Sequence, residues 1–497
     1  MIRFVDVCFT HSEAFEPLFE NVSLQFDVGW TGLVGANGSG KTTLLRLAAG
    51  ELEPSSGHVL RKGIVAFCRQ RTDFRPDGWK AFCDAADADA ARLKGVLGIR
   101  PDWWERWETL SHGERKRAQI AVALWEDPAL MFVDEPTNHL DGESGAMVRE
   151  ALASFRGVGI LVSHDRRLLD DICKNIVFIE PPGVLEISGN YSEASGQKAL
   201  GEEHQRRQRG AAKDELAKLQ REASRRQAEA ARSAHRLSKR HLHRNDSDGR
   251  GKLDLARLTG KDAIAGNFAR QIRNRVERAE EKLDSIGFKK EYDLAYHIEG
   301  ERSSRDVLLR LEQGVLPLGS SETLAFPDLV VMPADRIGLS GPNGTGKSSF
   351  VRHLLGRLNL PPDRVVYLPQ EIPIDDGERL IREVRRLSPD ELGRVLAFVS
   401  CLGTRPERLL RGDMPSPGEI RKILLALGIA RRPHLIVMDE PTNHLDLPAI
   451  ELLEKALQGF PGALILVSHD ARFLDGVTNI RWLFSREKSG LARMDKL

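Results

Sequence analysis

The sequence predicts an α/β fold in which two copies of one domain are joined by a long helical hairpin. Four motifs occur twice, in the same order, along the 497 residues. Apolar runs of strand length flank these motifs, as in buried parallel sheets. The segment between the copies has the composition of long helices. We therefore expect one domain over residues 1–191, a helical linker over residues 192–311 and a second domain over residues 312–497.

The duplication has a nearly constant spacing. Gly35–Thr42 reads GANGSGKT and returns 306 residues later as GPNGTGKS. The stretches that end in DEPTNHLD and in ILVSHD both return after 305 residues, and Gln70 has a counterpart, Gln370, after 300 residues. Four motifs in one order at nearly one offset indicate a duplicated domain and not a short solenoid repeat.

Apolar runs next to the first motif give the expected local elements. Trp30–Val34 and Arg336–Ser340 are typical of strands that feed glycine-rich turns. Helices are expected to follow from Thr43 and Ser349. Each copy should therefore contain a strand, a tight turn and a helix in succession.

Two further apolar runs, Leu130–Val133 and Leu435–Met438, are typical of buried parallel strands. The residues before the first glycine-rich turn leave room for an edge hairpin that pairs Arg3–Cys8 with Val22–Phe26. The second copy is expected to be trimmed at its front.

The linker is predicted to form two helices joined by a bend. From residue 197 to residue 240 it contains no proline and only two glycines. A stripe on one helical face is formed by Leu216, Leu219, Ala223, Gln227, Ala230, Ala234 and Leu237. His241–Gly266 contains four glycines and indicates a loop. A second stripe follows, formed by Phe268, Ile272, Val276, Ala279 and Leu283.

The linker also concentrates positive charge. The whole chain has a net charge of +1, but residues 201–290 hold 24 Lys and Arg against 14 Asp and Glu. This surplus of +10 leaves the rest of the chain acidic, at −9. Such a basic segment is typical of contacts with nucleic acid. Charge runs also occur on helices that are simply solvated, so both interpretations stay open.

Composition argues against several other classes of protein. No stretch approaches the ~18 consecutive apolar residues of a membrane-spanning helix, and the N-terminus lacks the long apolar segment of a secretory signal. The five cysteines are scattered without a CxxC pair. This argues against a disulfide framework, a zinc site or a cysteine nucleophile. We expect a cytoplasmic protein.

The first motif has the chemistry of a phosphate loop. In Gly-x-x-x-x-Gly-Lys-Thr/Ser, the glycines let backbone N–H groups surround phosphate oxygens. The lysine and the following helix N-terminus add positive charge, and the hydroxyl ligates Mg²⁺. Two matches, each followed by the same distal motifs, predict two nucleotide sites.

The acidic and histidine motifs complete this chemistry. In Asp134-Glu135 and its repeat, the aspartate is expected to hold Mg²⁺, directly or through water, and the glutamate to orient or deprotonate the attacking water. His164 and His469 follow a second apolar strand and are expected to contact the terminal phosphate. Neighbouring Ser-His-Asp residues do not converge as a hydrolase triad does, so that interpretation is excluded.

Together the motifs resemble those of ATP-binding cassette (ABC) ATPases: a phosphate loop, a glutamine loop, a signature loop, an acidic strand end, a D-loop and a switch histidine. Leu110–Glu114 reads LSHGE and resembles the signature LSGGE. EPTNHLD occurring twice, with a charged helical linker, resembles the ABC-F class in particular. The resemblance covers nearly the whole chain. It implies ATP and Mg²⁺ as cofactors and ATP hydrolysis as the reaction.

In that family two cassettes of one chain pair head to tail and enclose two ATP molecules, so that the phosphate loop of one half faces the signature of the other. The resemblance implies four catalytic residues, Glu135, Glu440, His164 and His469. Mg²⁺ is expected at Thr42, Gln70 and Asp134, and at Ser348, Gln370 and Asp439. The residues expected to bind ATP are Gly35, Asn37, Gly38, Ser39, Gly40, Lys41, Thr42, Thr43, Gln70, Ser111, Gly113, Gly341, Asn343, Gly344, Thr345, Gly346, Lys347, Ser348, Ser349, Gln370, Ser416 and Gly418. The resemblance also allows self-association of the nucleotide-free chain.

Three features depart from the family pattern. His112 and Pro417 stand where the two signatures usually have glycine. Because Pro417 has no N–H to offer a phosphate, we hypothesise that the first site, which borrows this signature, closes less tightly or turns over differently. His11 is a candidate for adenine stacking in the first copy only. The segment between the glutamine loop and the first signature is short, which indicates a chain without the arm insertion of some members.

The same short segment contains Trp103, Trp104 and Trp107. They could form a stacking platform for bases. We favour a packed helix face or a domain contact, because aromatic side chains are generally buried.

The resemblance implies the ribosome, its rRNA and tRNA, as partner, with the hairpin reaching toward the tRNA exit site and the protein modulating translation or protecting against antibiotics. The expected nucleic-acid contacts are Arg225, Arg226, Arg232, Arg236, Lys239, Arg240 and Arg244. Alternatives are an ABC ATPase that acts on DNA or another structured nucleic acid, and the fused energy module of a membrane importer. A regulatory protein with vestigial sites is disfavoured, because both lysines and both glutamates are present. We expect no membrane partner.

Overall fold

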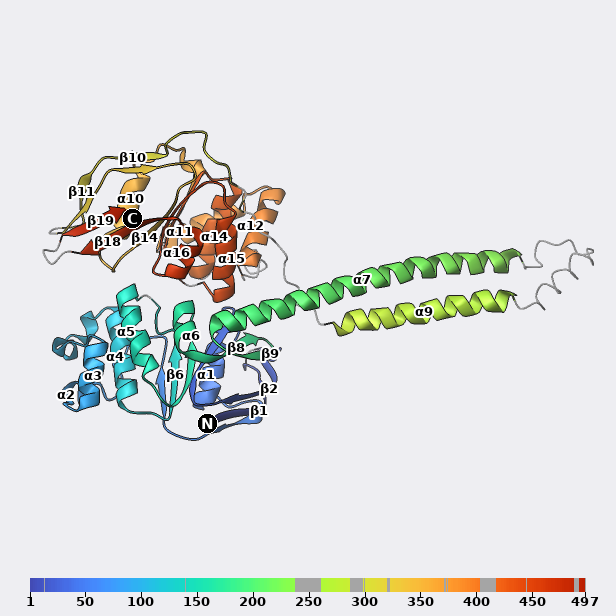
Figure 1. The fold of residues 1–497 in the computed structure, drawn as a ribbon, viewed down its shortest axis with the longest axis horizontal. Coiled ribbons are helices and arrows are strands. Elements are labelled where there is room, and N and C mark those ends of the chain that lie inside the picture. The colour runs from blue at the N-terminus through green and yellow to red at the C-terminus, as the bar shows by residue number, and fades with distance from the viewer. Residues whose placement is uncertain are drawn as a thin grey trace, which may run out of the picture. The chain divides into compact units, whose positions relative to one another are not determined.

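The computed structural model contains two compact units (Figure 1). One combines Met1–Ala194 with Asp293–Leu497, and the other is Ser195–Tyr292. We call Met1–Ala194 the first half and Asp293–Leu497 the second half. The structure describes residues 1–12, 14–138, 140–236, 261–286, 298, 300–319, 322–370, 372, 374–402, 417–443, 445–486 and 491–496.

A six-stranded sheet forms the centre of the first half, in the order β5-β6-β7-β3-β8-β9. The first five strands run parallel, and β9 pairs antiparallel with β8 at the edge. β6 and β7 are buried along their whole length, which is why the sequence shows them as continuous apolar runs. The bounds are β3 (Gly29–Gly35), β5 (Val65–Cys68), β6 (Leu130–Asp134), β7 (Val158–Val162), β8 (Cys173–Glu180) and β9 (Gly183–Ser188). The strands predicted at Trp30–Val34 and Leu130–Val133 are confirmed.

A second, antiparallel sheet contains β1 (Ile2–Phe9), β2 (Phe19–Phe26) and β4 (Ser56–Arg61), with β1 in the middle. The predicted edge hairpin is confirmed, because β1 and β2 pair antiparallel from Ile2 opposite Phe26 onward. Buried and exposed positions alternate along β2, so this sheet packs one face on the core.

Helices complete the first half. They are α1 (Lys41–Ala49), α2 (Trp79–Asp84), α3 (Ala88–Val96), α4 (His112–Trp125), α5 (Gly142–Ala153) and α6 (Arg166–Ile172), with short 3₁₀ turns at Pro101–Trp104 and Trp107–Thr109. Trp103 and Trp107 are buried in the core beside Trp79. Trp104 is half-buried, with the Arg75 guanidinium 5.3 Å from the centre of its ring. The packed-face interpretation of this tryptophan segment is therefore confirmed.

The second half contains an eight-stranded sheet in the order β11-β12-β19-β18-β14-β17-β16-β15, and a two-stranded ladder of β10 and β13. The strands are β10 (Leu309–Leu311), β11 (Gly314–Pro317), β12 (Thr323–Phe326), β13 (Leu329–Val331), β14 (Arg336–Ser340), β15 (Val365–Leu368), β16 (Leu435–Asp439), β17 (Ala463–Val467), β18 (Ile480–Arg486) and β19 (Ala492–Lys496). The expectation of a front trimmed in this copy is wrong, since four strands precede β14. They have three or four residues each, too short to show a periodic pattern.

The helices of the second half repeat those of the first. They are α10 (Lys347–Leu355), α11 (Ile374–Val384), α12 (Pro389–Cys401), α14 (Pro417–Ala430), α15 (Leu447–Gln458) and α16 (Ala471–Val477), with a 3₁₀ turn at Pro362–Arg364. The strands predicted at Arg336–Ser340 and Leu435–Met438 are confirmed as β14 and β16. The two halves therefore share one sequence of strand, loop and helix around each phosphate loop.

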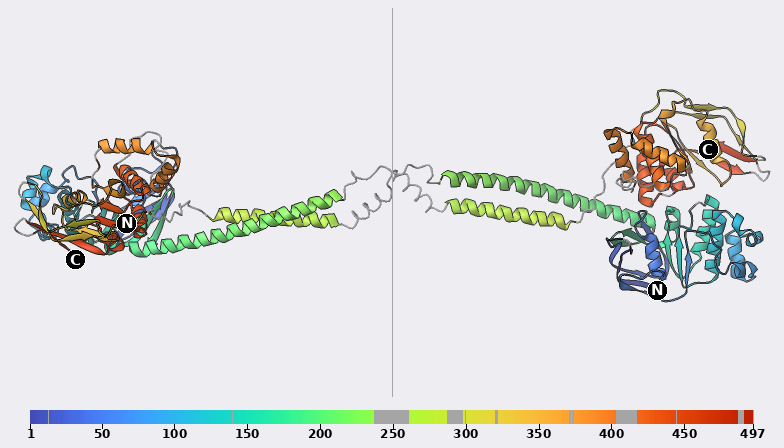
Figure 2. Two further views of the ribbon diagram at one scale, coloured as in Figure 1. Left: turned by 90° about the horizontal axis from the view of Figure 1, so that it is seen from above. Right: turned by 180° about the vertical axis from the view of Figure 1, so that it is seen from behind.

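The second unit is a helical hairpin formed by α7 (Tyr191–Arg236) and α9 (Lys261–Ser285), which lie side by side in every view (Figures 1 and 2). Ala212 and Leu219 on α7, with Ile272 and Ala279 on α9, are buried at the seam. Gln220 donates to Glu280 across the seam, with the side-chain nitrogen 3.3 Å from the carboxylate oxygen. The predicted hairpin thus forms, with Leu219, Ile272 and Ala279 of the predicted stripes at its seam, whereas Phe268 is 52% exposed and does not belong to it. The side chains of Ala230, Ala234 and Leu237 lie outside the described residues.

The structure of the hairpin differs from the sequence-based prediction in two details, one in the stripes and one in the bend. Gln227 is exposed and does not belong to the seam. The loop predicted over His241–Gly266 ends too late, because α9 already begins at Lys261. A glycine inside a helix costs only about 1 kcal/mol, so Gly266 does not interrupt it. None of the helices in the described part of the chain is long and apolar enough to cross a membrane.

Candidate ATP sites

The two phosphate loops share their backbone geometry. Gly40 and Gly346 precede α1 and α10 in the left-handed region, with φ of 97° and 88°. Both helices therefore begin two residues before the predicted starts at Thr43 and Ser349. A Cβ at Gly40 would lie 2.8 Å from the Phe19 ring, so both the backbone angle and the space favour glycine here.

A lysine ammonium group lies inside each loop. Lys41 Nζ donates to the carbonyl oxygens of Gly35 and Ala36 at 2.9 and 3.0 Å. Lys347 makes the two equivalent bonds at 2.7 and 2.9 Å. Burial lowers the pKa of both lysines, against nearby carboxylates that raise it. Each loop therefore combines a positive charge, a helix N-terminus and a glycine-rich backbone. This is the combination that binds phosphate in proteins.

Oxygen donors meet beside each lysine. Thr42 Oγ1 donates to Asp134 Oδ2 at 2.9 Å. In the second half, both carboxylate oxygens of Asp439 are buried beside the Ser348 hydroxyl. Burial raises the pKa of Asp134 and of Asp439. Hydroxyl and carboxylate oxygens of this kind are the donors that Mg²⁺ prefers, and a bound cation would satisfy the buried oxygens of Asp439.

A glutamate and a histidine face each other in each half. His164 Nε2 lies 3.2 Å from Glu135 Oε1, and His469 Nε2 lies 3.4 Å from Glu440 Oε1. Burial raises the pKa of both glutamates to about 8 and lowers the pKa of both histidines to about 4. At pH 7 the histidines are therefore neutral and the glutamates mostly protonated. The backbone of each glutamate is left-handed, with φ of 49° and 50°, so both side chains are aimed by an uncommon conformation.

The two halves contact each other through these loops. Asp446, which caps the start of α15, accepts from the backbone N–H of Asn37 at 2.7 Å. Asp141, which caps α5, accepts from the N–H of Asn343 at 3.4 Å. Both aspartates end the repeated EPTNHLD motif. These two aspartates are not among the site residues expected from the sequence, although their identical place in the two repeats could have indicated a shared role.

An ion-pair cluster adds to this interface. Arg166 on α6 is 4% exposed and donates to Glu454 on α15 at 2.8 Å, with Asp470 at 3.5 Å. Tyr191, the first residue of α7, donates through its hydroxyl to Glu451 at 2.7 Å. The halves are therefore joined by charge-assisted hydrogen bonds between side chains, as well as by hydrogen bonds from backbone N–H groups to carboxylates.

Most of the residues expected to bind ATP or Mg²⁺ line one cleft of about 1050 Å³ between the halves. These are Asn37, Gly38, Gly40, Lys41, Thr42, Thr43, Gln70, Asp134, Glu135, His164, Asn343, Gly344, Gly346, Lys347, Ser348, Ser349, Gln370, Gly418, Asp439, Glu440 and His469. His11, the stacking candidate, lies at the same cleft, with its ring 4.9 Å from that of Phe9. The lining does not include Gly35, Ser39, Gly341 or Thr345. Ser39 and Thr345 are buried, and Thr345 Oγ1 donates to a carbonyl of its own loop.

The two signatures differ in which of their described residues line the cleft. Ser111 caps α4 in a capping box with Glu114, and neither Ser111 nor Gly113 lines the cleft. Gly418 lines it, whereas Ser416 lies outside the described residues. Pro417 is the first residue of α14, the helix position that proline tolerates best.

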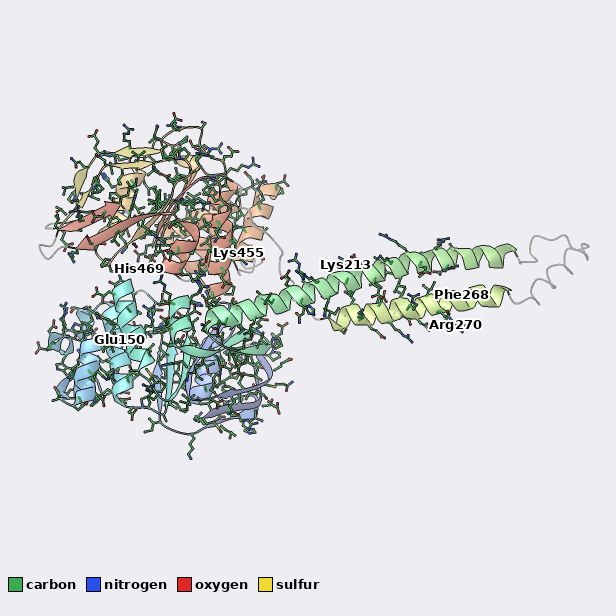
Figure 3. The ribbon with its side chains drawn as sticks, in the orientation of Figure 1. Glu150, Lys213, Phe268, Arg270, Lys455 and His469 are labelled. Carbon is green, nitrogen blue, oxygen red and sulfur yellow. The ribbon has the colours of Figure 1, made fainter. Side chains whose placement is uncertain are left out.

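The expected nucleic-acid residues lie on or beyond α7. Arg225 and Arg226 are exposed on this helix. Arg232 and Arg236 belong to α7, but the structure does not describe their side chains, and Lys239, Arg240 and Arg244 lie outside the described residues. Figure 3 shows Lys213 on α7 and Arg270 on α9, two exposed basic residues that are not among the nucleic-acid contacts expected from the sequence.

Comparisons with known proteins agree with this geometry. The family model described as "ABC transporter" matches residues 19–138 and 327–443, one match in each half. The tylosin resistance ATP-binding protein TlrC of Streptomyces fradiae is 30% identical over 531 residues, which cover 92% of either chain. This chain belongs to the ABC-F family of ATP-binding cassette proteins. Its two cassettes, the first and second halves, bind ATP, and the protein is an ATPase.

Other relatives and solved structures are consistent with an ABC-F protein. The ribosome protection protein VmlR of Bacillus subtilis is 29% identical, over 95% of this chain and 84% of its own. The solved structure of an RNase-L inhibitor superposes with a TM-score of 0.62 at 18% identity, covering 98% of this chain and 89% of that one. An archaeal ribosome recycling factor, aABCE1, gives 0.63 at 16% identity. At such identities, the structural matches show the twin-cassette fold alone.

Proposed function

We propose that this ATPase binds the ribosome through its basic hairpin and uses its ATP cycle to modulate translation or to protect ribosomes from antibiotics. The observation that carries the proposal is the basic hairpin itself, which lies in the sequence between the two cassettes. Residues 201–290 hold a surplus of ten positive charges. Arg225, Arg226 and Arg270 are exposed on its two helices. A relative named for ribosome protection supports this choice of partner, and one named for tylosin resistance supports a role against antibiotics.

The ATP cycle would run through both cassettes. ATP held between the phosphate loops and the facing half would tie the halves together, and hydrolysis would release them. Residues Thr42 and Asp134, with Ser348 and Asp439, would hold Mg²⁺, which balances the charge of the phosphates when bound. Gln70 and Gln370 line the same cleft and would contribute amide oxygens.

Within each site, Glu135 or Glu440 would accept the proton of the attacking water. With a pKa of about 8, about one glutamate in ten is ionised at pH 7 before ligands bind. The neighbouring histidine is neutral, so its Nε2 can take either hydrogen-bonding role toward the glutamate or the terminal phosphate. The pair would therefore be set for proton transfer near neutral pH.

The test is ribosome co-sedimentation of the double variant Glu135→Gln/Glu440→Gln, which should bind ATP without turnover. We expect it to sediment with ribosomes in the presence of ATP and to remain in the supernatant without it. Lys41→Ala/Lys347→Ala, which cannot hold ATP, is the matched control and should not sediment. Failure to bind at low salt would remove the proposal.

The same experiment addresses the choice of nucleic acid. Arg225→Ala/Arg226→Ala should weaken ribosome binding, and Gln227→Ala, a neutral exposed neighbour on α7, should not. Each lost phosphate contact reduces the slope of log affinity against log salt by about 0.7–0.9. Tighter binding of branched DNA than of ribosomes by the trapped variant would favour a DNA-directed ATPase instead.

A further inference from the structure

Several cations outside the phosphate loops are buried, and two of them lie on the helices that follow the signatures. Lys116 on α4 is fully buried, and Arg421 on α14 is 5% exposed. They occupy equivalent positions, five residues after Ser111 and Ser416 of the two signatures. Lysine and arginine are almost never fully buried without partners, so the contacts of this pair are informative.

The partners of both cations are backbone carbonyls around the ATP site. Lys116 Nζ donates to the carbonyl oxygen of Arg69, just before Gln70, at 2.6 Å and to that of Asp134 at 3.0 Å. Each head group therefore joins three segments that are distant in sequence: the signature helix, the glutamine loop and the end of the strand that carries the catalytic acids.

In the second cassette the guanidinium of Arg421 repeats and extends this arrangement. It donates to the carbonyl oxygen of Gln370, and to those of Asp439 at 3.0 Å and Glu440 at 2.9 Å. The same three segments are joined, with one more bond. Two different cations thus bond to carbonyls of the same two segments, the glutamine loop and the end of the acidic strand.

These carbonyls flank the catalytic glutamates. The Asp134 carbonyl belongs to the peptide unit that enters Glu135, and the Asp439 and Glu440 carbonyls belong to the peptide units on both sides of Glu440. Both glutamates have a left-handed backbone, which a residue with a side chain rarely adopts unless its surroundings fix it. A cation bonded to the adjacent carbonyls is such a constraint, and it is stronger than a neutral hydrogen bond.

We propose that Lys116 and Arg421 are positioning residues for ATP hydrolysis. Each holds the peptide units beside its catalytic glutamate and ties them to the glutamine loop and to its own signature helix. A movement of that helix is thereby passed to the general base of the same cassette. The proposal rests on the ATPase activity and not on ribosome binding.

The decisive variants are Lys116→Met and Lys116→Arg, each placed in a Glu440→Gln background so that only the first cassette turns over. We expect Lys116→Met to lower kcat at least tenfold while KM for ATP changes less than threefold. Lys116→Arg should retain at least half of kcat, because arginine already occupies the equivalent place in the second cassette. Arg421→Met and Arg421→Lys in a Glu135→Gln background form the mirror experiment.

Hydrogen exchange of the full-length variants separates positioning from general stability. In Lys116→Met, peptides covering residues 133–137 should exchange faster, whereas the β3 strand should exchange as in the parent. The proposal is overturned if Lys116→Met keeps kcat within twofold of the parent. It is equally overturned if Lys116→Arg loses as much kcat as Lys116→Met. If the methionine variants fail to fold, the double variant Lys116→Arg/Arg421→Lys provides the test. A loss of more than half of kcat in this double variant overturns the proposal.

Discussion

Replacing Arg166 with methionine should loosen the contact between the two cassettes. Arg166 is 4% exposed and donates to Glu454 at 2.8 Å, with Asp470 at 3.5 Å. Methionine keeps much of the volume but removes the charge. The two carboxylates would then face each other without the cation that compensates them.

The size of the effect follows from the burial of the three groups. Removing one partner of a fully buried ion pair costs about 3–5 kcal/mol. Here the Glu454 and Asp470 side chains keep 17% and 19% of their exposure, so water reaches both. A charge-assisted hydrogen bond is worth about 1.5–3 kcal/mol. We therefore expect the free energy of opening the interface to fall by about 2–3 kcal/mol, which is about a 30- to 150-fold change in the opening equilibrium.

Hydrogen exchange of the Asn37 amide measures this opening. Its N–H donates to Asp446 across the interface at 2.7 Å, so it exchanges only when the halves separate or the loop opens. In Arg166→Met, peptides covering residues 35–40 should exchange about 30 to 150 times faster than in the parent. Peptides from the buried strand β6 should be unchanged.

Arg167→Met is the matched control. Arg167 also faces a carboxylate of the other half, Asp475, but at 4.0 Å and with both side chains more than half exposed. An exposed pair of this kind contributes about 0–1 kcal/mol. Equal exchange in Arg166→Met and Arg167→Met would refute the reasoning, as would faster exchange of β6 to the same degree, since that would report unfolding of the cassette.

Three further predictions concern the ATP sites. Because burial raises the pKa of Glu135 and Glu440 to about 8, kcat/KM for ATP should rise with pH from 6 and level off above about 8; a flat profile would contradict the assigned base. Glu440→Gln should abolish more ATPase activity than Glu135→Gln if the signature that contains Pro417, which has no N–H to offer a phosphate, pairs with the first site; equal losses would remove the asymmetry. Gly40→Ala should weaken nucleotide binding at the first site about tenfold in a titration with a fluorescent ATP analogue, since φ is 97° and a Cβ would lie within 2.9 Å of two side chains. The control Gly356→Ala, at φ −71°, should bind the analogue as the parent does.

Sequence patterns predicted the parts of the fold that repeat a strong local signal. β6 and β16 are continuous apolar runs because both faces of each strand are buried. The phosphate loops follow from glycine spacing, since the left-handed backbone before each helix requires glycine. The hairpin seam follows from apolar residues at helical spacing, although Gln227 and Phe268 are exposed and show that such spacing does not by itself establish burial.

The elements that depend on tertiary contacts could not be predicted in this way. β10 to β13 are short strands whose pairing partners, not their own pattern, define them. Lys116 lies among charged residues of a helix and looks like a solvated side chain, yet it is buried by carbonyls 47 and 18 residues away. The aspartates that end the EPTNHLD motif gain their role only when the other half supplies the backbone N–H they accept from.

The Arg166–Glu454 pair also makes the choice of partner selective. Glu454 occupies the position that Arg149 has in the first cassette, 305 residues earlier, and Ala471 stands where the first cassette has Arg166. If first cassettes from two chains met in the same geometry, Arg166 would face Arg149, and two guanidinium groups would repel each other. If two second cassettes met, Glu454 would face alanine and have no cation. The charge pattern therefore favours joining the two unlike halves of one polypeptide over mixing like halves from different molecules.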